Sequence, residues 1–104
     1  MTERSPADAR RLEAVVHGRV QGVGFRFHAA RAAARHGILG WVANERDGTV
    51  RAVGEGPEPA VRAWLDELRR GPADAWVDRV DERWSVATHA FSDFEVRSGW
   101  HAGD

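Results

Sequence analysis

Gly22, Gly24 and Arg26 lie close together early in the chain, in the segment GRVQGVGFR at residues 18–26. Gly22 and Gly24 can adopt backbone angles that other residues avoid, so successive N–H groups of this loop can converge on one anion. A helix beginning at Phe25 would add the partial positive charge of its N-terminus, and Arg26 a planar, two-pronged donor. The segment therefore predicts a site for a small anion such as phosphate.

This segment does not match the familiar nucleotide-binding motifs. Phe27 stands where the dinucleotide-binding fingerprint requires a glycine, and the chain has no Gly-Lys-Ser/Thr sequence of a P-loop. A plainer interpretation also exists, in which the glycines only turn the chain into a helix and Arg26 is a surface residue. The loop taken alone leaves both interpretations open.

A second candidate group is Asn44, in the segment GWVANERDGTV at residues 40–50. Its carboxamide has one acceptor and two donors, so it can hold an attacking water while it contacts a neighbouring oxygen. An asparagine before a turn also commonly satisfies local backbone groups, which is the plainer interpretation of this residue.

The composition excludes several other chemistries. The chain has no cysteine, which rules out disulfides, thiolate nucleophiles, iron–sulfur clusters and cysteine-bound zinc. All 15 basic residues are arginine, so there is no lysine to form a Schiff base. The histidines show no paired-ligand spacing, and we expect neither a metal nor a cofactor. The five histidines are His17, His28, His36, His89 and His101.

Hydrophobic periodicity predicts the elements that must position these groups. Alternating apolar residues predict a strand over Leu12–Arg19, and an alanine-rich run predicts a helix over Phe25–His36. Phe27, Ala30 and Ala34 form the predicted apolar face of this helix. The loop with the glycines would then join a strand directly to a helix N-terminus.

The rest of the chain completes a recognisable order of elements. Strands over Ile38–Asn44 and Thr49–Val53 should form a hairpin, because an Asp-Gly pair lies between them. A helix over Glu58–Arg70 has apolar residues at i, i+3, i+4 and i+7, and strands follow over Trp76–Val86 and Phe94–Arg97. The order predicts an α+β, ferredoxin-like βαββαβ fold: an antiparallel sheet with two helices on one face and a short extra C-terminal strand.

We expect one domain in the 104 residues, with 1–10 a flexible N-terminal tail, 11–98 the folded part and 99–104 a C-terminal tail. No apolar run approaches the roughly 20 residues that span a membrane, and no signal-like segment follows Met1. We therefore expect a cytoplasmic protein without a membrane partner. The formal net charge of −1 also argues against a nucleic-acid partner.

The two chemistry-bearing segments together resemble the signatures of the acylphosphatase family. The matching residues are Gly-Arg-Val-Gln-Gly-Val-Gly-Phe-Arg at 18–26 and Gly-Trp-Val-x-Asn-x-x-Asp-Gly-Thr-Val at 40–50. The likeness extends from about Leu12 to Arg97. It implies the same βαββαβ fold and the metal-independent hydrolysis of an acyl phosphate to a carboxylate and inorganic phosphate.

The resemblance also implies roles for individual residues. Arg26 corresponds to the phosphate-binding arginine of the family and Asn44 to the asparagine that orients the attacking water. The implied backbone cradle for the phosphate consists of Gln21, Gly22, Val23, Gly24, Phe25 and Arg26. His28 and Glu45 depart from the family pattern, and a carboxylate beside the site would disfavour an anionic substrate if it pointed inward. We expect Glu45 to face water.

Two other classes of function stand beside this one. Similar domains begin larger maturation proteins that use carbamoyl phosphate, so the alternative is a phosphate- or carbamoyl-phosphate-binding module without turnover of its own. RNA-binding domains share the topology, but Thr49–Val53 lacks the aromatic residues on which bases stack. We therefore expect a monomer whose partner is a small acyl phosphate.

Overall fold

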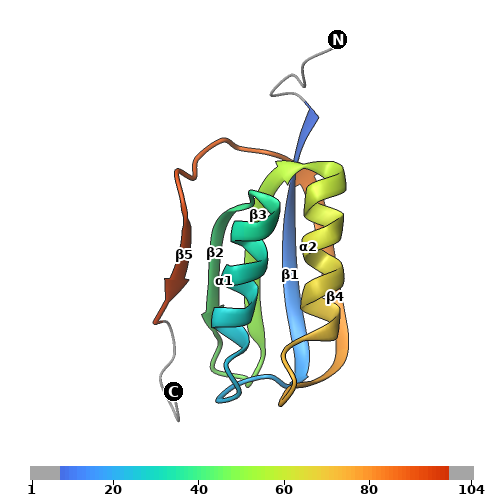
Figure 1. The fold of residues 1–104 in the computed structure, drawn as a ribbon, viewed down its shortest axis with the longest axis vertical. Coiled ribbons are helices and arrows are strands. Elements are labelled where there is room, and N and C mark those ends of the chain that lie inside the picture. The colour runs from blue at the N-terminus through green and yellow to red at the C-terminus, as the bar shows by residue number, and fades with distance from the viewer. Residues whose placement is uncertain (1–7, 99–104) are drawn as a thin grey trace.

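The computed structural model describes residues 8–98 and contains the predicted elements in the predicted order (Figure 1). The strands are β1 (Ala9–Arg19), β2 (Leu39–Asn44), β3 (Val50–Pro57), β4 (Trp76–Val86) and β5 (Phe94–Arg97). The helices are α1 (Phe25–His36) and α2 (Glu58–Arg70). Both helices, β4 and β5 have the predicted bounds. Most of the predicted N-terminal tail and all of 99–104, with Trp100 and His101, lie outside the described residues.

The sheet has the strand order β4-β1-β3-β2-β5, and both helices lie on one of its faces (Figure 1). The first four strands pair antiparallel, which confirms the predicted ferredoxin-like arrangement. β5 differs, because it pairs parallel with β2. The chain leaves β4 at one end of the sheet and crosses to the opposite edge at that same end, so β5 must run opposite to β4 and along β2.

β1 begins at Ala9, earlier than the predicted start at Leu12. Its first residues pair with the end of β3, where Ala9 lies opposite Pro57 and Arg10 opposite Gly56. Pairing with neighbouring strands thus makes the start of β1 a strand, although its sequence shows no hydrophobic periodicity. β3 likewise extends beyond the predicted end at Val53, because β1 supplies partners for its last residues.

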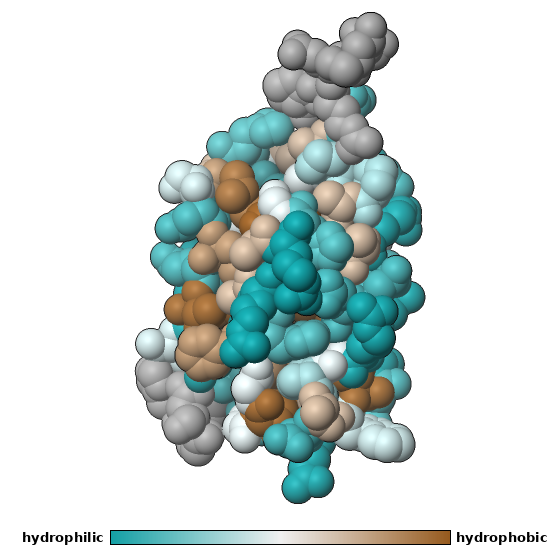
Figure 2. All heavy atoms as spheres, viewed as in Figure 1, coloured by the Kyte–Doolittle hydropathy of each residue, from teal (hydrophilic) through white to brown (hydrophobic). Residues whose placement is uncertain are grey.

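The core lies between the sheet and the helices. On β1, Leu12, Ala14 and Val16 are each 0% exposed, as the alternation predicts. α2 buries the four apolar residues of its predicted stripe: Val61, Trp64, Leu65 and Leu68. Figure 2 shows a largely hydrophilic surface on the helix-bearing side, with apolar residues in smaller groups.

The predicted apolar face of α1 is wrong. Phe27 is 61% exposed, and the helix instead buries a face that starts two residues earlier, at Phe25. Its buried residues are Phe25, Ala29, Ala32 and Ala33. These positions follow the i, i+4, i+7, i+8 pattern equally well, and each face starts with a phenylalanine, so only packing on the sheet selects the face with Phe25.

Within residues 8–98, neither helix is long and apolar enough to cross a membrane.

Candidate functional site

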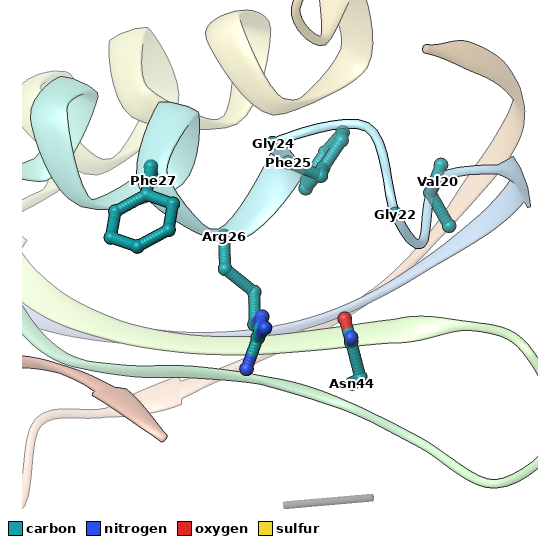
Figure 3. Close-up of a pocket in the computed structure, with 7 residues that line it drawn as sticks. All are labelled: Val20, Gly22, Gly24, Phe25, Arg26, Phe27 and Asn44. Atoms are coloured by element: carbon teal, nitrogen blue, oxygen red, sulfur yellow. The ribbon is translucent and has the colours of Figure 1, made fainter. Parts of the chain in front are cut away.

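The loop between β1 and α1 lines a pocket of about 240 Å³ (Figure 3). Gly22 and Gly24 have φ angles of +73° and +80°, in the left-handed region that favours glycine. Gly24 is also the N-cap of α1, and among the described residues no side chain caps this helix end. The positive end of the helix dipole therefore faces the pocket, as an anion site requires. The lining residues are Val20, Gly22, Gly24, Phe25, Arg26, Phe27 and Asn44.

Arg26 extends from the first turn of α1 across the pocket toward Asn44 (Figure 3). Its Nη1 donates a hydrogen bond to the backbone carbonyl of Arg97 on β5, at 2.9 Å. This contact ties the guanidinium to the edge strand β5. An arginine with its charged end held in place presents its remaining N–H groups in a defined direction.

Asn44 lies at the end of β2 and is 4% exposed. Its side chain points from the strand toward the loop and lies beside the end of the Arg26 side chain (Figure 3). β2 places it there because Asn44 pairs with Val50 of β3 immediately before the hairpin. The carboxamide and the guanidinium thus approach one pocket from opposite layers of the fold.

Gln21 connects the loop to this hairpin. Its Nε2 donates to the carbonyl oxygens of Glu45 and Thr49, at 2.7 and 2.9 Å. The hairpin is closed by Asp47, whose carboxylate accepts from the N–H and the hydroxyl of Thr49. These bonds, that of the hydroxyl first, lower the pKa of Asp47. The loop and the strand end that carries Asn44 are therefore fixed relative to each other.

The structure brings five of the sequence-predicted site residues to the pocket and leaves two outside it. Gly22, Gly24, Phe25, Arg26 and Asn44 line it, whereas Gln21 and Val23 do not. The Gln21 amide is bonded to the hairpin and Val23 packs against the core, so each of these two has only its backbone to offer an anion.

Sequence reasoning missed three contributions to this site: Val20, Phe27 and the carbonyl of Arg97. The family-like segment at 18–26 already contains Val20, and Phe27 follows it directly. Nothing in the sequence signals the carbonyl, because every residue has one and only the pairing of β5 with β2 places it.

The two residues that depart from the family pattern lie outside the pocket lining. The ring of His28 turns toward α2, where its Nε2 donates to the carbonyl of Glu67 at 2.9 Å. Glu45 is half-buried in the hairpin. His17, at the end of β1, bonds to Asp81 at 2.8 Å, and this bond lowers the pKa of the Asp81 carboxyl.

Within residues 8–98, no three His, Cys, Asp or Glu side chains lie together as a metal site would need. The positively polarised groups around the pocket come from the chain itself, namely the helix N-terminus and Arg26. Their charge suits an anionic ligand.

Fold and pocket define an α+β sandwich domain with an anion-type site where its first strand passes into its first helix. Comparison with known proteins identifies the family to which this domain belongs. The family model described as acylphosphatase matches residues 12–96, and the chain belongs to the acylphosphatase family.

Individual relatives agree with the family match. The acylphosphatase of Salinibacter ruber is 47% identical over 88 residues, which cover 85% of this chain and 93% of the relative. The crystal structure of the acylphosphatase from Bacillus subtilis has a TM-score of 0.82 and 31% identity, and it covers 85% of this chain and 98% of that one.

A larger protein also contains a similar domain. Full-length HypF, solved in a phosphate- and nucleotide-bound form, has a TM-score of 0.80 and 25% identity. The match covers 88% of this chain but 12% of HypF.

Proposed function

We propose that this chain hydrolyses acyl phosphates to a carboxylate and inorganic phosphate. The family membership carries this proposal, together with the placement of Arg26 and Asn44 on one pocket at the N-terminus of α1. This chain matches 93% of the length of the Salinibacter ruber acylphosphatase, whereas it matches 12% of the HypF chain. The alternative of a binding module without turnover is therefore not favoured.

The proposed ground-state complex places the phosphate in the loop between residues 21 and 26. The backbone N–H groups of this cradle and the guanidinium of Arg26 would bind its oxygens, because both are donors in a pocket at a helix N-terminus. The support for this arrangement is the left-handed backbone of Gly22 and Gly24, which opens the loop toward the pocket. The acyl group would extend from the phosphate toward solvent.

In the proposed reaction, the carboxamide of Asn44 holds a water that attacks phosphorus. The phosphorus–oxygen bond to the acyl group breaks, and the carboxylate leaves with the electron pair. A phosphate oxygen takes the proton of the water, so the step needs no side chain that titrates. An acyl phosphate already has a good leaving group, and positioning and charge stabilisation supply the rest of the catalysis.

We propose that no metal takes part, because Arg26 and the helix N-terminus supply the positive charge that a metal would otherwise bring. We also propose that the protein acts as a monomer, since a single chain supplies both side chains of the site. The cytoplasmic location and the lack of a nucleic-acid partner stay predictions from the sequence.

The test is hydrolysis of benzoyl phosphate in the presence of a chelator. Arg26→Ala should lower the rate by about a hundred- to thousandfold, as loss of a preorganised oxyanion donor does. Asn44→Ala should abolish most of the turnover while KM changes less than kcat, because it removes the group that holds the water. Arg31→Ala, an exposed arginine on the same helix, is the matched control and should keep full activity.

Undiminished turnover of a folded Arg26→Ala or Asn44→Ala protein would contradict the assignment of that residue. Turnover that disappears on addition of chelator and returns with a divalent cation would contradict the metal independence. Binding of phosphate without any hydrolysis would favour the binding-module alternative.

A further inference from the structure

Phe27 is a large apolar side chain that the core does not use. The residue is 61% exposed, whereas Phe25 and Ala29 on the buried face of the same helix are at most 1% exposed. An exposed phenyl ring contributes little to folding, because its surface stays in water. The packing of α1 therefore gives no reason for a phenylalanine at this position.

The ring nevertheless belongs to the wall of the pocket. Figure 3 shows Phe27 beside Arg26, on the side of that arginine away from Gly22 and Val20. The other two apolar side chains of the lining, Val20 and Phe25, are each 1% exposed and offer almost no surface to a ligand. Among the residues that line this pocket, Phe27 thus provides the accessible apolar area.

We propose that the ring of Phe27 packs against the acyl group of the substrate and makes the site selective for aromatic or other large apolar acyl groups. The inference rests on the proposed function, which places the phosphate among the loop, Arg26 and Asn44. With its phosphate held there, the substrate directs its acyl group out of the pocket toward solvent, and Phe27, which lines the pocket beside Arg26, is exposed there. A phenyl group can cover the exposed ring, whereas a methyl group covers little of it.

The experiment compares kcat/KM for benzoyl phosphate and acetyl phosphate in the unmutated protein and in Phe27→Ala and Phe27→Leu. Phe27→Ala should lower the benzoyl-to-acetyl ratio of kcat/KM about tenfold, the effect expected from losing one apolar contact surface. Phe27→Leu should give an intermediate ratio. The change should lie mostly in KM for benzoyl phosphate, because the contact exists before and during the reaction.

Val86→Ala serves as the matched control. Val86 is also apolar and exposed, at 68%, but it lies at the end of β4 and pairs with Arg10, and it is not part of the pocket lining. Its substitution should leave the benzoyl-to-acetyl ratio unchanged. Thermal unfolding of each variant checks that the fold is intact. We expect intact folds, because the side chains of Phe27 and Val86 are both exposed.

An unchanged ratio in Phe27→Ala would overturn the inference while the proposed function stands. An equal loss with both substrates would also overturn it, since Phe27 would then act on the reacting centre rather than on the acyl group. If the unmutated protein hydrolysed neither substrate, the proposed function would fail first and this inference with it.

Discussion

Arg26 and Asn44 owe their positions to contacts of different kinds. The guanidinium of Arg26 is fixed at its far end by the carbonyl of Arg97, while Asn44 is fixed by burial at the end of a paired strand. Gln21 joins the loop to the strand end through two carbonyl oxygens. Holding the reacting groups in place before the substrate arrives is a large part of what catalysis of phosphoryl transfer requires.

Gly24 allows a clean test of the loop geometry, because Gly37 at the other end of α1 has a similar backbone. Their φ angles are +80° and +68°, and a Cβ at either position would meet no atom within 4 Å. Gly24→Ala and Gly37→Ala should each lower the free energy of unfolding by about 1 to 2 kcal/mol, the cost of a left-handed L-residue. Urea unfolding measures this cost.

Only Gly24→Ala should lower kcat/KM for benzoyl phosphate, since Gly24 lines the pocket and Gly37 does not. Equal activity in the two variants would show that the exact path of the loop is unimportant for turnover. Equal loss of activity would point to general destabilisation instead.

Among the elements, β5 is short but directly contacts a side chain of the site. It covers four residues, yet it supplies the carbonyl that holds Arg26. The connection that leads into it is fastened by Glu55 of β3, whose side chain accepts from the backbone N–H groups of Thr88 and His89. The carboxylate also accepts from the Thr88 hydroxyl and from Arg11. Glu55 therefore fixes the route of the chain from one sheet edge to the other.

Removal of this carboxylate should destabilise the protein in a pH-dependent way. Burial by itself would raise the pKa of Glu55, but the hydrogen bonds from Thr88, His89 and Arg11 outweigh it and lower that pKa. The stabilisation is therefore complete above the ordinary pKa of a glutamate and is lost as the pH falls through the lower pKa of the folded state. At neutral pH, Glu55→Gln should cost about 1 to 3 kcal/mol, because an amide NH₂ would face backbone donors.

Urea unfolding of both proteins across the acidic range checks this expectation, and the difference between them should shrink as the pH falls. Glu95→Gln is the control: this carboxylate bonds to Arg97 at the surface, with 56% of its side chain exposed. Its loss should change stability by less than about 1 kcal/mol. A difference between wild type and Glu55→Gln that grows on acidification would contradict the role assigned to Glu55.

On the scale of the whole molecule, Trp64 links the layers of the fold. It is 0% exposed, its indole N–H donates to the carbonyl of Ala29 on α1 at 3.1 Å, and its ring meets Phe94 of β5 edge to face. Gly54 of β3 lies directly beneath it, where a Cβ would come within 2.4 Å of the indole ring. One side chain of α2 thus contacts the other helix, the sheet and the strand that positions Arg26.

Trp64→Ala should lower the free energy of unfolding by about 3 to 5 kcal/mol, the usual cost of emptying such a core position. That is a large share of the roughly 5 to 15 kcal/mol available to a domain of this kind. Trp76→Ala is the matched control, because Trp76 is 70% exposed and should contribute less than about 1 kcal/mol. Denaturant unfolding followed by circular dichroism distinguishes them, and equal losses would contradict the central role of Trp64.

The type and order of the elements, and the two chemistry-bearing side chains, could be predicted from the sequence alone. Periodicity and terminal residues act within a few neighbours, so the bounds of α1, α2, β4 and β5 could be predicted. Arg26 and Asn44 were found because their residue types can bind an anion and a water and because their segments resemble a known family. The structure then placed both on one pocket.

The buried face of α1, the place of β5 in the sheet and the contact that holds Arg26 depend on tertiary packing and could not be predicted. The alanines of α1 allow more than one apolar face, and packing on the sheet chose the face with Phe25 and left Phe27 at the pocket. The carbonyl of Arg97 became a partner of Arg26 through the parallel pairing of β5 with β2. Such contacts join residues far apart in the chain through backbone atoms common to every residue, so no residue type announces them.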